Sequence, residues 1–260
     1  MESKIIGRGL LAGSLAGVLA FLFARIFVEP VIGRAVDYEA GRSEAHAAVS
    51  GMHEHSMELF TRDVQSWVGL GFGVLAFSVA MGGLFAVGFV MACNRFPGLS
   101  ARMLSVVLAA GAFVTVCLVP FLKYPANPPA VGEGDTMKER AGLYLLMMLL
   151  SVALALGALW LGRRLAPRLG TWGATLTALG GYMAVVGAVM WVLPPIAETP
   201  QPMAEPSGMI TYPGFPADDL YHFRLYALGA QVVIWATIGL VFGVLVSRLL
   251  EGQRRRHISV

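Results

Sequence analysis

Charged residues are scarce in this sequence of 260 residues. Asp, Glu, Lys and Arg together make up 13% of the chain, whereas soluble domains carry about 25%. Hydrophobic residues make up 57%, and the mean hydropathy is +0.69. So few charges cannot cover the water-exposed surface of a soluble protein of this length. We therefore expect much of the surface to face lipid.

Cysteine is rare, and the common motifs of catalysis are absent from the sequence. The two cysteines, Cys93 and Cys117, form no C-x-x-C pair, which argues against a thiol redox site. The sequence has no G-x-x-x-x-G-K-[ST] phosphate loop, no G-x-S-x-G nucleophile turn, no kinase signature and no haem attachment motif. The net charge of +3 gives little support for nucleic-acid binding. We predict no enzyme activity and no resident cofactor.

Long apolar runs recur along the chain, each close to the roughly 20 residues that a helix needs to cross a bilayer. They are continuously apolar rather than alternating, which favours helices over a β-barrel. The sequence therefore predicts an all-α membrane protein, a bundle of about six transmembrane helices. The predicted spans are 5–28, 66–93, 103–122, 141–162, 171–193 and 225–247. They form a single membrane domain, residues 1–252, followed by a basic cytoplasmic tail, 253–260.

The first span contains Arg25 near its end, and no clear cleavage site follows it. We expect it to be a retained helix and not a cleaved signal peptide.

Basic residues gather in alternate loops. The N-terminus, the loops 94–102 and 163–168 and the segment 248–260 hold eleven Lys or Arg and two acidic residues. The loops 29–63, 123–140 and 198–224 hold seven basic and fourteen acidic residues. Because Lys and Arg are retained on the cytoplasmic side, this pattern predicts a multi-pass inner-membrane protein with both termini inside.

Prolines follow the first, third and fifth predicted spans. They are Pro30, then Pro120 and Pro125, then Pro194 and Pro195. Since proline disfavours helix continuation, we expect these helices to end there. The chain then resembles three successive helical hairpins that open outward.

Glycines recur at four-residue spacing in three of the predicted spans. The sets are Gly9, Gly13 and Gly17, then Gly69 and Gly73, then Gly239 and Gly243. Small residues at this spacing let helix backbones approach closely. The pattern fits a tightly packed bundle or a homo-oligomer, and it equally fits the general abundance of glycine in membrane helices.

The first outer loop holds three of the five histidines, His46, His53 and His55, with Glu58 close by. Imidazole and carboxylate groups bind divalent transition metals, so these four residues are the candidate metal ligands. If the segment 46–65 is helical, His55 and Glu58 share a face and His53 lies on another. A closed site then needs a bend or a second segment, and a solvated loop with incidental histidines fits the pattern equally well.

The run Val119–Gly132 places four prolines around Lys123, Tyr124 and Asn127. It predicts a rigid, non-helical segment that forms either the outer mouth of a pathway or an interfacial turn with a snorkelling lysine. On the sixth predicted helix, Arg224, just before the span, shares a helical face with Gln231 and Trp235. These polar side chains either bond a neighbouring helix or line a substrate path.

The run 119–132, V-P-F-L-K-Y-P-A-N-P-P-A-V-G, closely resembles the family of predicted cobalt transporter subunits called CbtA. L-F-T-R-D-V-Q at 59–65 and the segment from F-P-A at 215–217 through F-R-L at 223–225 to L-G-A-Q at 228–231 fit the same pattern. The resemblance implies uptake of cobalt(II), or of a similar ion such as nickel(II). It also implies a small one-span partner subunit of the CbtB type.

Two functions follow from these observations. The first is a subunit of a cobalt uptake transporter, with an acidic outer face that concentrates cations and with the histidine loop as the capture site. Energy would come from a partner, an ion gradient or the membrane potential. The alternative is a non-transporting scaffold or metal-sensing subunit that binds a small partner protein. A membrane enzyme ranks last, because no acid–base pair is visible inside the spans.

Overall fold

The computed structural model describes residues 2–50, 64–132, 134–204 and 208–258. In chain order the helices are α1 (Glu2–Phe23), α2 (Glu29–Ser50), α4 (Leu70–Cys93), α5 (Ala101–Ala112), α6 (Val119–Lys123), α7 (Gly134–Val192) and α8 (Ala217–Ile258). Three π-helical turns accompany them: η1 (Ala24–Val28), η2 (Gln65–Gly69) and η3 (Phe113–Leu118). Two short antiparallel strands, β1 (Met203–Ala204) and β2 (Ile210–Tyr212), form the sheet.

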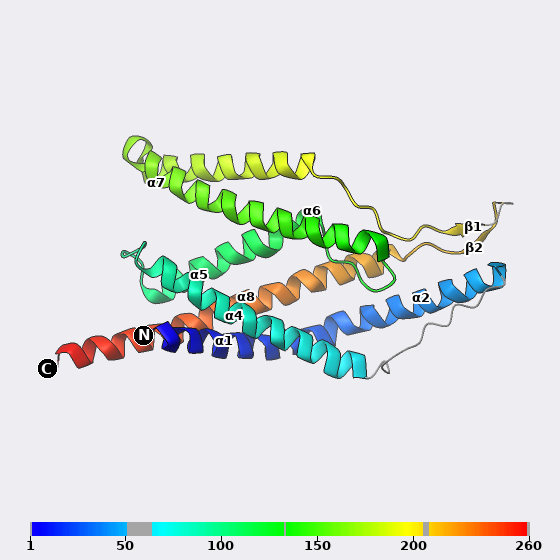
Figure 1. The fold of residues 1–260 in the computed structure, drawn as a ribbon, viewed down its shortest axis with the longest axis horizontal. Coiled ribbons are helices and arrows are strands. Elements are labelled where there is room, and N and C mark those ends of the chain that lie inside the picture. Colours follow the sequence, from blue (N-terminus) through cyan, green and yellow to red (C-terminus); the bar gives the residue numbers. More distant parts are fainter. Residues whose placement is uncertain (1, 51–63, 133, 205–207, 259–260) are drawn as a thin grey trace.

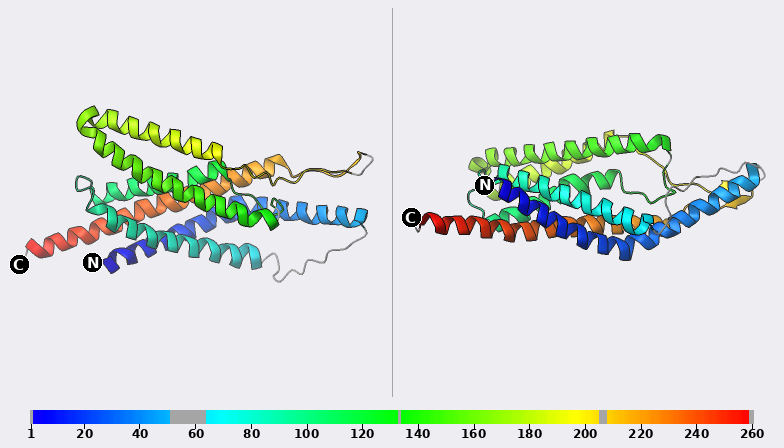
Figure 2. Two further views of the ribbon diagram at one scale, coloured as in Figure 1. Left: turned by 45° about the horizontal axis from the view of Figure 1, so that its top comes forward. Right: turned by 60° about the horizontal axis from the view of Figure 1, so that its bottom comes forward.

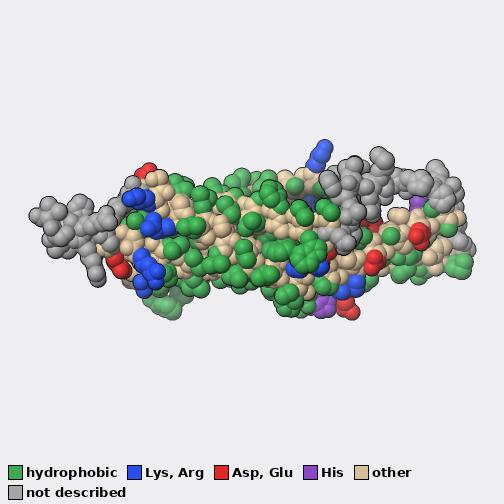
Figure 3. Space-filling view, turned by 90° about the horizontal axis from the view of Figure 1, so that it is seen from below, with side chains coloured by type: hydrophobic (Ala, Val, Ile, Leu, Met, Phe, Trp, Pro, Cys, Tyr) green, Lys and Arg blue, Asp and Glu red, His purple; other side chains and the backbone are tan. Residues whose placement is uncertain are grey.

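Among the described residues, five helical stretches are long and apolar enough to cross a membrane. They are Glu2–Ala48, Ser66–Cys93, Ala101–Lys123, Thr136–Val192 and Ala217–Glu251. The helices run along one long axis (Figure 1), and a belt of hydrophobic side chains covers the middle of the molecule (Figure 3). The prediction of an all-α, multi-pass membrane protein is therefore confirmed.

The longest of these stretches, α7, is folded back on itself. Gly170 interrupts the helix with a φ of 69° and a ψ of 166°, a backbone conformation that glycine adopts readily. The two arms lie antiparallel (Figures 1 and 2), and a hydrogen bond of 2.8 Å joins Ser151 to Tyr182 across them. The predicted spans 141–162 and 171–193 are these two arms, so the prediction of six crossings depends on whether both arms cross.

The ends of the bundle differ in what they contain. Both termini, the turn at 94–100 and the bend at Gly170 lie at one end of the bundle. The proline-rich run, the sheet and the far end of α2 lie at the other (Figure 1). This arrangement places the two sets of loops that differ in charge at opposite ends of the molecule.

Two of the prolines that lie inside helical segments, Pro30 and Pro120, stand where the sequence predicted helix ends. Pro30 is the second residue of α2, and the helix continues beyond it to Ser50. Pro120 belongs to α6, which continues η3 without a break. A proline ring normally clashes with the carbonyl four residues earlier. In both places a π-helical turn ends two residues before the proline, so the regular α-helical hydrogen-bond pattern is already interrupted there. The predicted end of the first helix at residue 28 is therefore wrong.

Glycines form the closest helix contacts. A Cβ added to Gly9 or Gly13 would collide with the backbone of α4 at Gly82 or Ser78. On α8, a Cβ on Gly239 would lie only 2.6 Å from that of Ala109 on α5. The glycine pattern in α1 and α8 therefore serves packing within the bundle, which follows the small-residue rule for membrane helices.

Aromatic side chains fill the space between these helices. The ring of Phe242 lies 5.2 Å from that of Phe85 and 5.1 Å from that of Phe89, both in edge-to-face geometry. Phe89 and Phe242 are almost completely buried. These contacts hold α8 against α4, and α1 packs on both.

The Gly82→Ala variant should be destabilised, because a methyl group there meets the α1 backbone, which has no room to move aside. Overpacking of this kind costs about 1–3 kcal/mol, which lowers the melting temperature by roughly 5 °C in a chain of this size. Gly73→Ala is the matched control, since nothing lies within 4 Å of a Cβ there. Heating the detergent-solubilised variants and measuring the surviving monodisperse fraction checks this, and equal melting temperatures would contradict the packing.

Candidate functional site

The proline-rich run has an irregular backbone. Tyr124 ends α6 with a φ of −127° and a ψ of 75°, and Pro125 follows it. A turn closes further along, where the Val131 N–H donates to the Pro128 carbonyl at 3.2 Å. Ala130 adopts a φ of 67°, which is uncommon for a residue other than glycine. The run is therefore non-helical from Tyr124 onward, whereas its first five residues, Val119–Lys123, are helical, contrary to the prediction for the whole run.

A buried carboxylate holds this loop in place. The Glu198 side chain follows the second arm of α7 and is 2% exposed. It accepts hydrogen bonds from Asn127 Nδ2 at 3.0 Å, from Thr136 Oγ1 at 2.7 Å and from Arg140 Nη1 at 2.9 Å. Arg140 also donates to the carbonyl of Pro125. Three donors, one of them charged, meet the requirement that a buried charge be paired and hydrogen-bonded.

Arg224 extends these contacts to α8. Its Nη2 donates to Asn127 Oδ1 at 2.9 Å, and its Nε reaches the carbonyl of Ala126 at 3.4 Å. The amide of Asn127 thus bridges Arg224 and Glu198. We call these residues the Glu198 network: Asn127, Thr136, Arg140, Glu198 and Arg224.

The network joins four parts of the chain that are distant in sequence. They are the proline-rich run, the start of α7, the segment after α7 and the first turns of α8. The sequence pattern indicates Asn127 and Arg224 as candidates, but it does not indicate Glu198, Thr136 or Arg140. The one available signal was an acidic residue just after Pro194 and Pro195, where the fifth predicted span ends.

Lys123 and Tyr124 lie beside the network without joining it. Tyr124 is buried, and its hydroxyl donates to the carbonyl of Pro194 at 2.9 Å. Burial raises the pKa of Tyr124, and the negative charge of Glu139 raises it further, so the phenol stays neutral. The ammonium of Lys123 lies 5.8 Å from the centre of the Tyr124 ring. Tyr124 therefore anchors the end of α6 to the segment after α7.

Gln231 bonds a neighbouring helix. The thiol of Cys117, on η3, lies 3.4 Å from Gln231 Oε1, and the indole N–H of Trp235 donates to the same sulfur at 3.2 Å. One turn further along α8, the carbonyl of Gly239 accepts from Ser105 Oγ at 2.7 Å. These contacts fit the packing interpretation of this polar face, because each of them joins α8 to the α5–η3 segment.

Of the four candidate metal ligands, only His46 lies within the part of the chain that the structure describes. His46 is exposed near the far end of α2. His53, His55 and Glu58 lie outside the described residues. Within the described ranges, no group of three or more His, Cys, Asp or Glu side chains is arranged to hold a metal ion. The metal site in this loop therefore stays a prediction.

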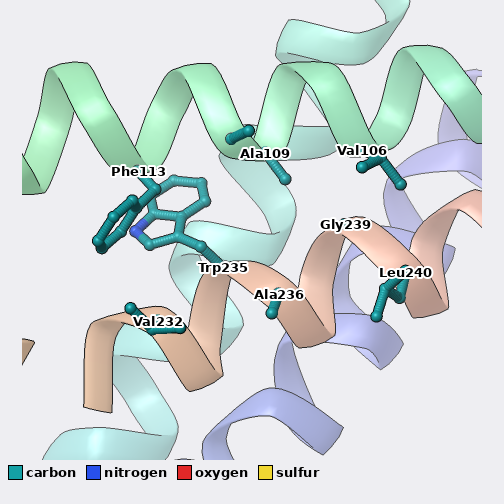
Figure 4. Close-up of a pocket in the computed structure, with 9 residues that line it drawn as sticks. Val106, Ala109, Phe113, Val232, Trp235, Ala236, Gly239 and Leu240 are labelled. Atoms are coloured by element: carbon teal, nitrogen blue, oxygen red, sulfur yellow. The ribbon is translucent and has the colours of Figure 1, made fainter. Parts of the chain in front are cut away.

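The hollow between α5 and α8 is apolar. It measures about 300 Å³, and the side chains of Val106, Phe113 and Trp235 face it (Figure 4). Trp235 turns its polar N–H away toward Cys117. This hollow is suited to hydrocarbon and offers no ligand to a cation.

Comparison with known protein families gives one match. A family model described as "Probable cobalt transporter subunit (CbtA)" matches residues 2–247, nearly the whole chain. No curated protein and no solved structure matches the chain.

The Glu198→Gln variant should lose stability, because Arg140 and Arg224 would keep their charges without the buried carboxylate that Arg140 pairs with. Removing one partner of a buried ion pair costs about 3 kcal/mol or more. Glu139→Gln, the same change at an exposed carboxylate only a few residues from the network, is the control and should behave as the unmodified protein. Thermal unfolding of the two purified variants tests this, and equal melting temperatures would show that the network does not hold the loop.

Proposed function

The chain belongs to the CbtA family of probable cobalt transporter subunits, and we propose that it helps to move cobalt(II) into the cell across the inner membrane. The observation that carries the proposal is the family match, which extends over residues 2–247. The apolar helices agree with it, since a transporter subunit must span the bilayer. A role in transport also agrees with the absence of catalytic motifs from the sequence.

We infer six crossings, with both termini in the cytoplasm. Each arm of α7 is long enough to cross the hydrocarbon core, since about 20 residues suffice. Because α7 crosses twice, the five apolar helices make six membrane crossings. The end that holds the termini and the bend at Gly170 carries most of the basic residues, which supports a cytoplasmic position for it by the positive-inside rule.

The Glu198 network serves as a structural latch rather than an ion site. The Glu198 carboxylate already accepts from three donors, and Arg140 and Arg224 hold positive charge beside it. A divalent cation placed there would be repelled by two guanidinium groups. We therefore assign Asn127, Arg224, Lys123 and Tyr124 to holding the outer mouth of the bundle in shape. Gln231 joins α8 to η3 below it.

We infer that the outer loop captures the ion. His46, His53, His55 and Glu58 offer nitrogen and oxygen donors that suit cobalt(II) or nickel(II). The surrounding loops are acidic, which raises the local concentration of cations. A small one-span subunit of the CbtB type would complete the transporter. Because the sequence has no nucleotide-binding motif, energy comes from such a partner, an ion gradient or the membrane potential.

The alternative function is a scaffold or metal-sensing subunit without transport activity. It shares the membrane fold and the partner subunit, and it differs in predicting metal binding without flux. Uptake measurements therefore separate the two functions directly.

Cells that express the chain with its partner should accumulate radioactive cobalt above the empty-vector level. Replacing His46, His53 and His55 with alanine should reduce this uptake at least about tenfold, because it removes the imidazole ligands. His222→Ala is the control, since His222 lies on α8 outside the loop and should leave uptake unchanged. No uptake with or without the partner, although the protein is present in the membrane, would contradict transport and favour the scaffold.

A further inference from the structure

A second and larger hollow opens between the α5–η3 segment and the two arms of α7. It measures about 600 Å³. Small residues line much of it, among them Ala110, Gly111, Ala155, Ala158 and Ala178. Their size leaves a deep apolar groove between helices that face lipid. We propose that this groove binds an anionic phospholipid, with an acyl chain in the groove and the phosphate at Arg163.

Arg163 is held at the mouth of the groove. Its side chain lines the hollow, and its guanidinium lies 4.4 Å from the centre of the Phe96 ring, which lines the hollow too. Its Nη2 donates to the carbonyl of Arg95 at 2.9 Å. This bond uses one of the five N–H groups that a guanidinium presents. The side chain is exposed, so further N–H groups are available to phosphate oxygens.

All charged residues in the two segments that meet at Arg163 are basic. The segments 94–102 and 163–168 contain Arg95, Arg102, Arg163, Arg164 and Arg168 and neither Asp nor Glu. The segments at this end of the bundle also contain two acidic residues, Glu2 and Glu251. These lie on α1 and α8, which do not line the groove. An anionic headgroup would be attracted here, whereas a zwitterionic one would gain much less.

The combination of an apolar groove and a basic mouth distinguishes a lipid from another transmembrane helix. A helix with small and apolar residues would fill the groove but would leave the arginines without a counter-charge. A phospholipid supplies both hydrocarbon and phosphate in one molecule. Basic pockets between membrane helices are a recurrent way of holding such headgroups. Lipid binding in this groove does not depend on cobalt transport.

Native mass spectrometry of the purified full chain tests the proposal. Phosphatidylglycerol and phosphatidylcholine with identical acyl chains would be titrated separately, and glycerol phosphate would report binding of the headgroup alone. We expect phosphatidylglycerol to bind more tightly than phosphatidylcholine and glycerol phosphate not to bind. Arg163→Gln should weaken phosphatidylglycerol binding about fivefold, the effect of one basic residue near an anionic surface.

Two further variants test whether lipid binding depends on the groove itself or only on positive charge anywhere on the protein. Ala158→Phe fills the groove without changing charge and should also weaken binding. Arg248→Gln removes one exposed arginine from α8, outside the groove, and should leave binding unchanged. Equal binding of the two lipids, equal losses in Arg163→Gln and Arg248→Gln, or full binding in Ala158→Phe would each overturn the proposal.

Discussion

The constraint on which this structure depends is that lipid offers no hydrogen bonds to the backbone. Every segment at membrane depth must pair its own N–H and C=O groups, so the chain is helical throughout its apolar runs. Even Pro30 and Pro120 do not break the helices, because π-helical turns carry the chain past them. Irregular backbone is found at the ends of the bundle, at the bend near Gly170 and in the proline-rich run.

At the end of the bundle that holds the proline-rich run, a buried charge must likewise find its partners within the protein. The Glu198 carboxylate is almost inaccessible to water, so its charge must be paired within the protein. Arg140 pairs with it directly, and Asn127 connects it to Arg224 on α8. In our account this network stiffens the outer mouth and leaves ion capture to the loop beyond it. The family description names cobalt, and in our account the residues of the Glu198 network shape the protein and do not bind metal.

Features governed by composition were predictable from the sequence. The positions of the apolar helices followed from charge-free runs, since a charged side chain at membrane depth is costly. The end of the first helix was not predictable in this way, because a π-helical turn before Pro30 leaves no signature in hydropathy. Glu198, Thr136 and Arg140 were missed for another reason. Glu198 meets Thr136 and Arg140 only because α7 folds back on itself, and nothing in their spacing along the chain reports these contacts.

The most direct test of this account is the sidedness of the two ends of the second arm of α7, which runs from the bend at Gly170 to Val192. Single cysteines at Arg168 and Gln201, both exposed positions, would be introduced into a chain without Cys93 and Cys117. A membrane-impermeant maleimide would then be applied to intact cells. We predict that the cysteine at position 201 is labelled at once and the one at 168 only after the membrane is opened. Labelling of both positions from the same side would contradict six crossings, the cytoplasmic termini and the outer position of the Glu198 network.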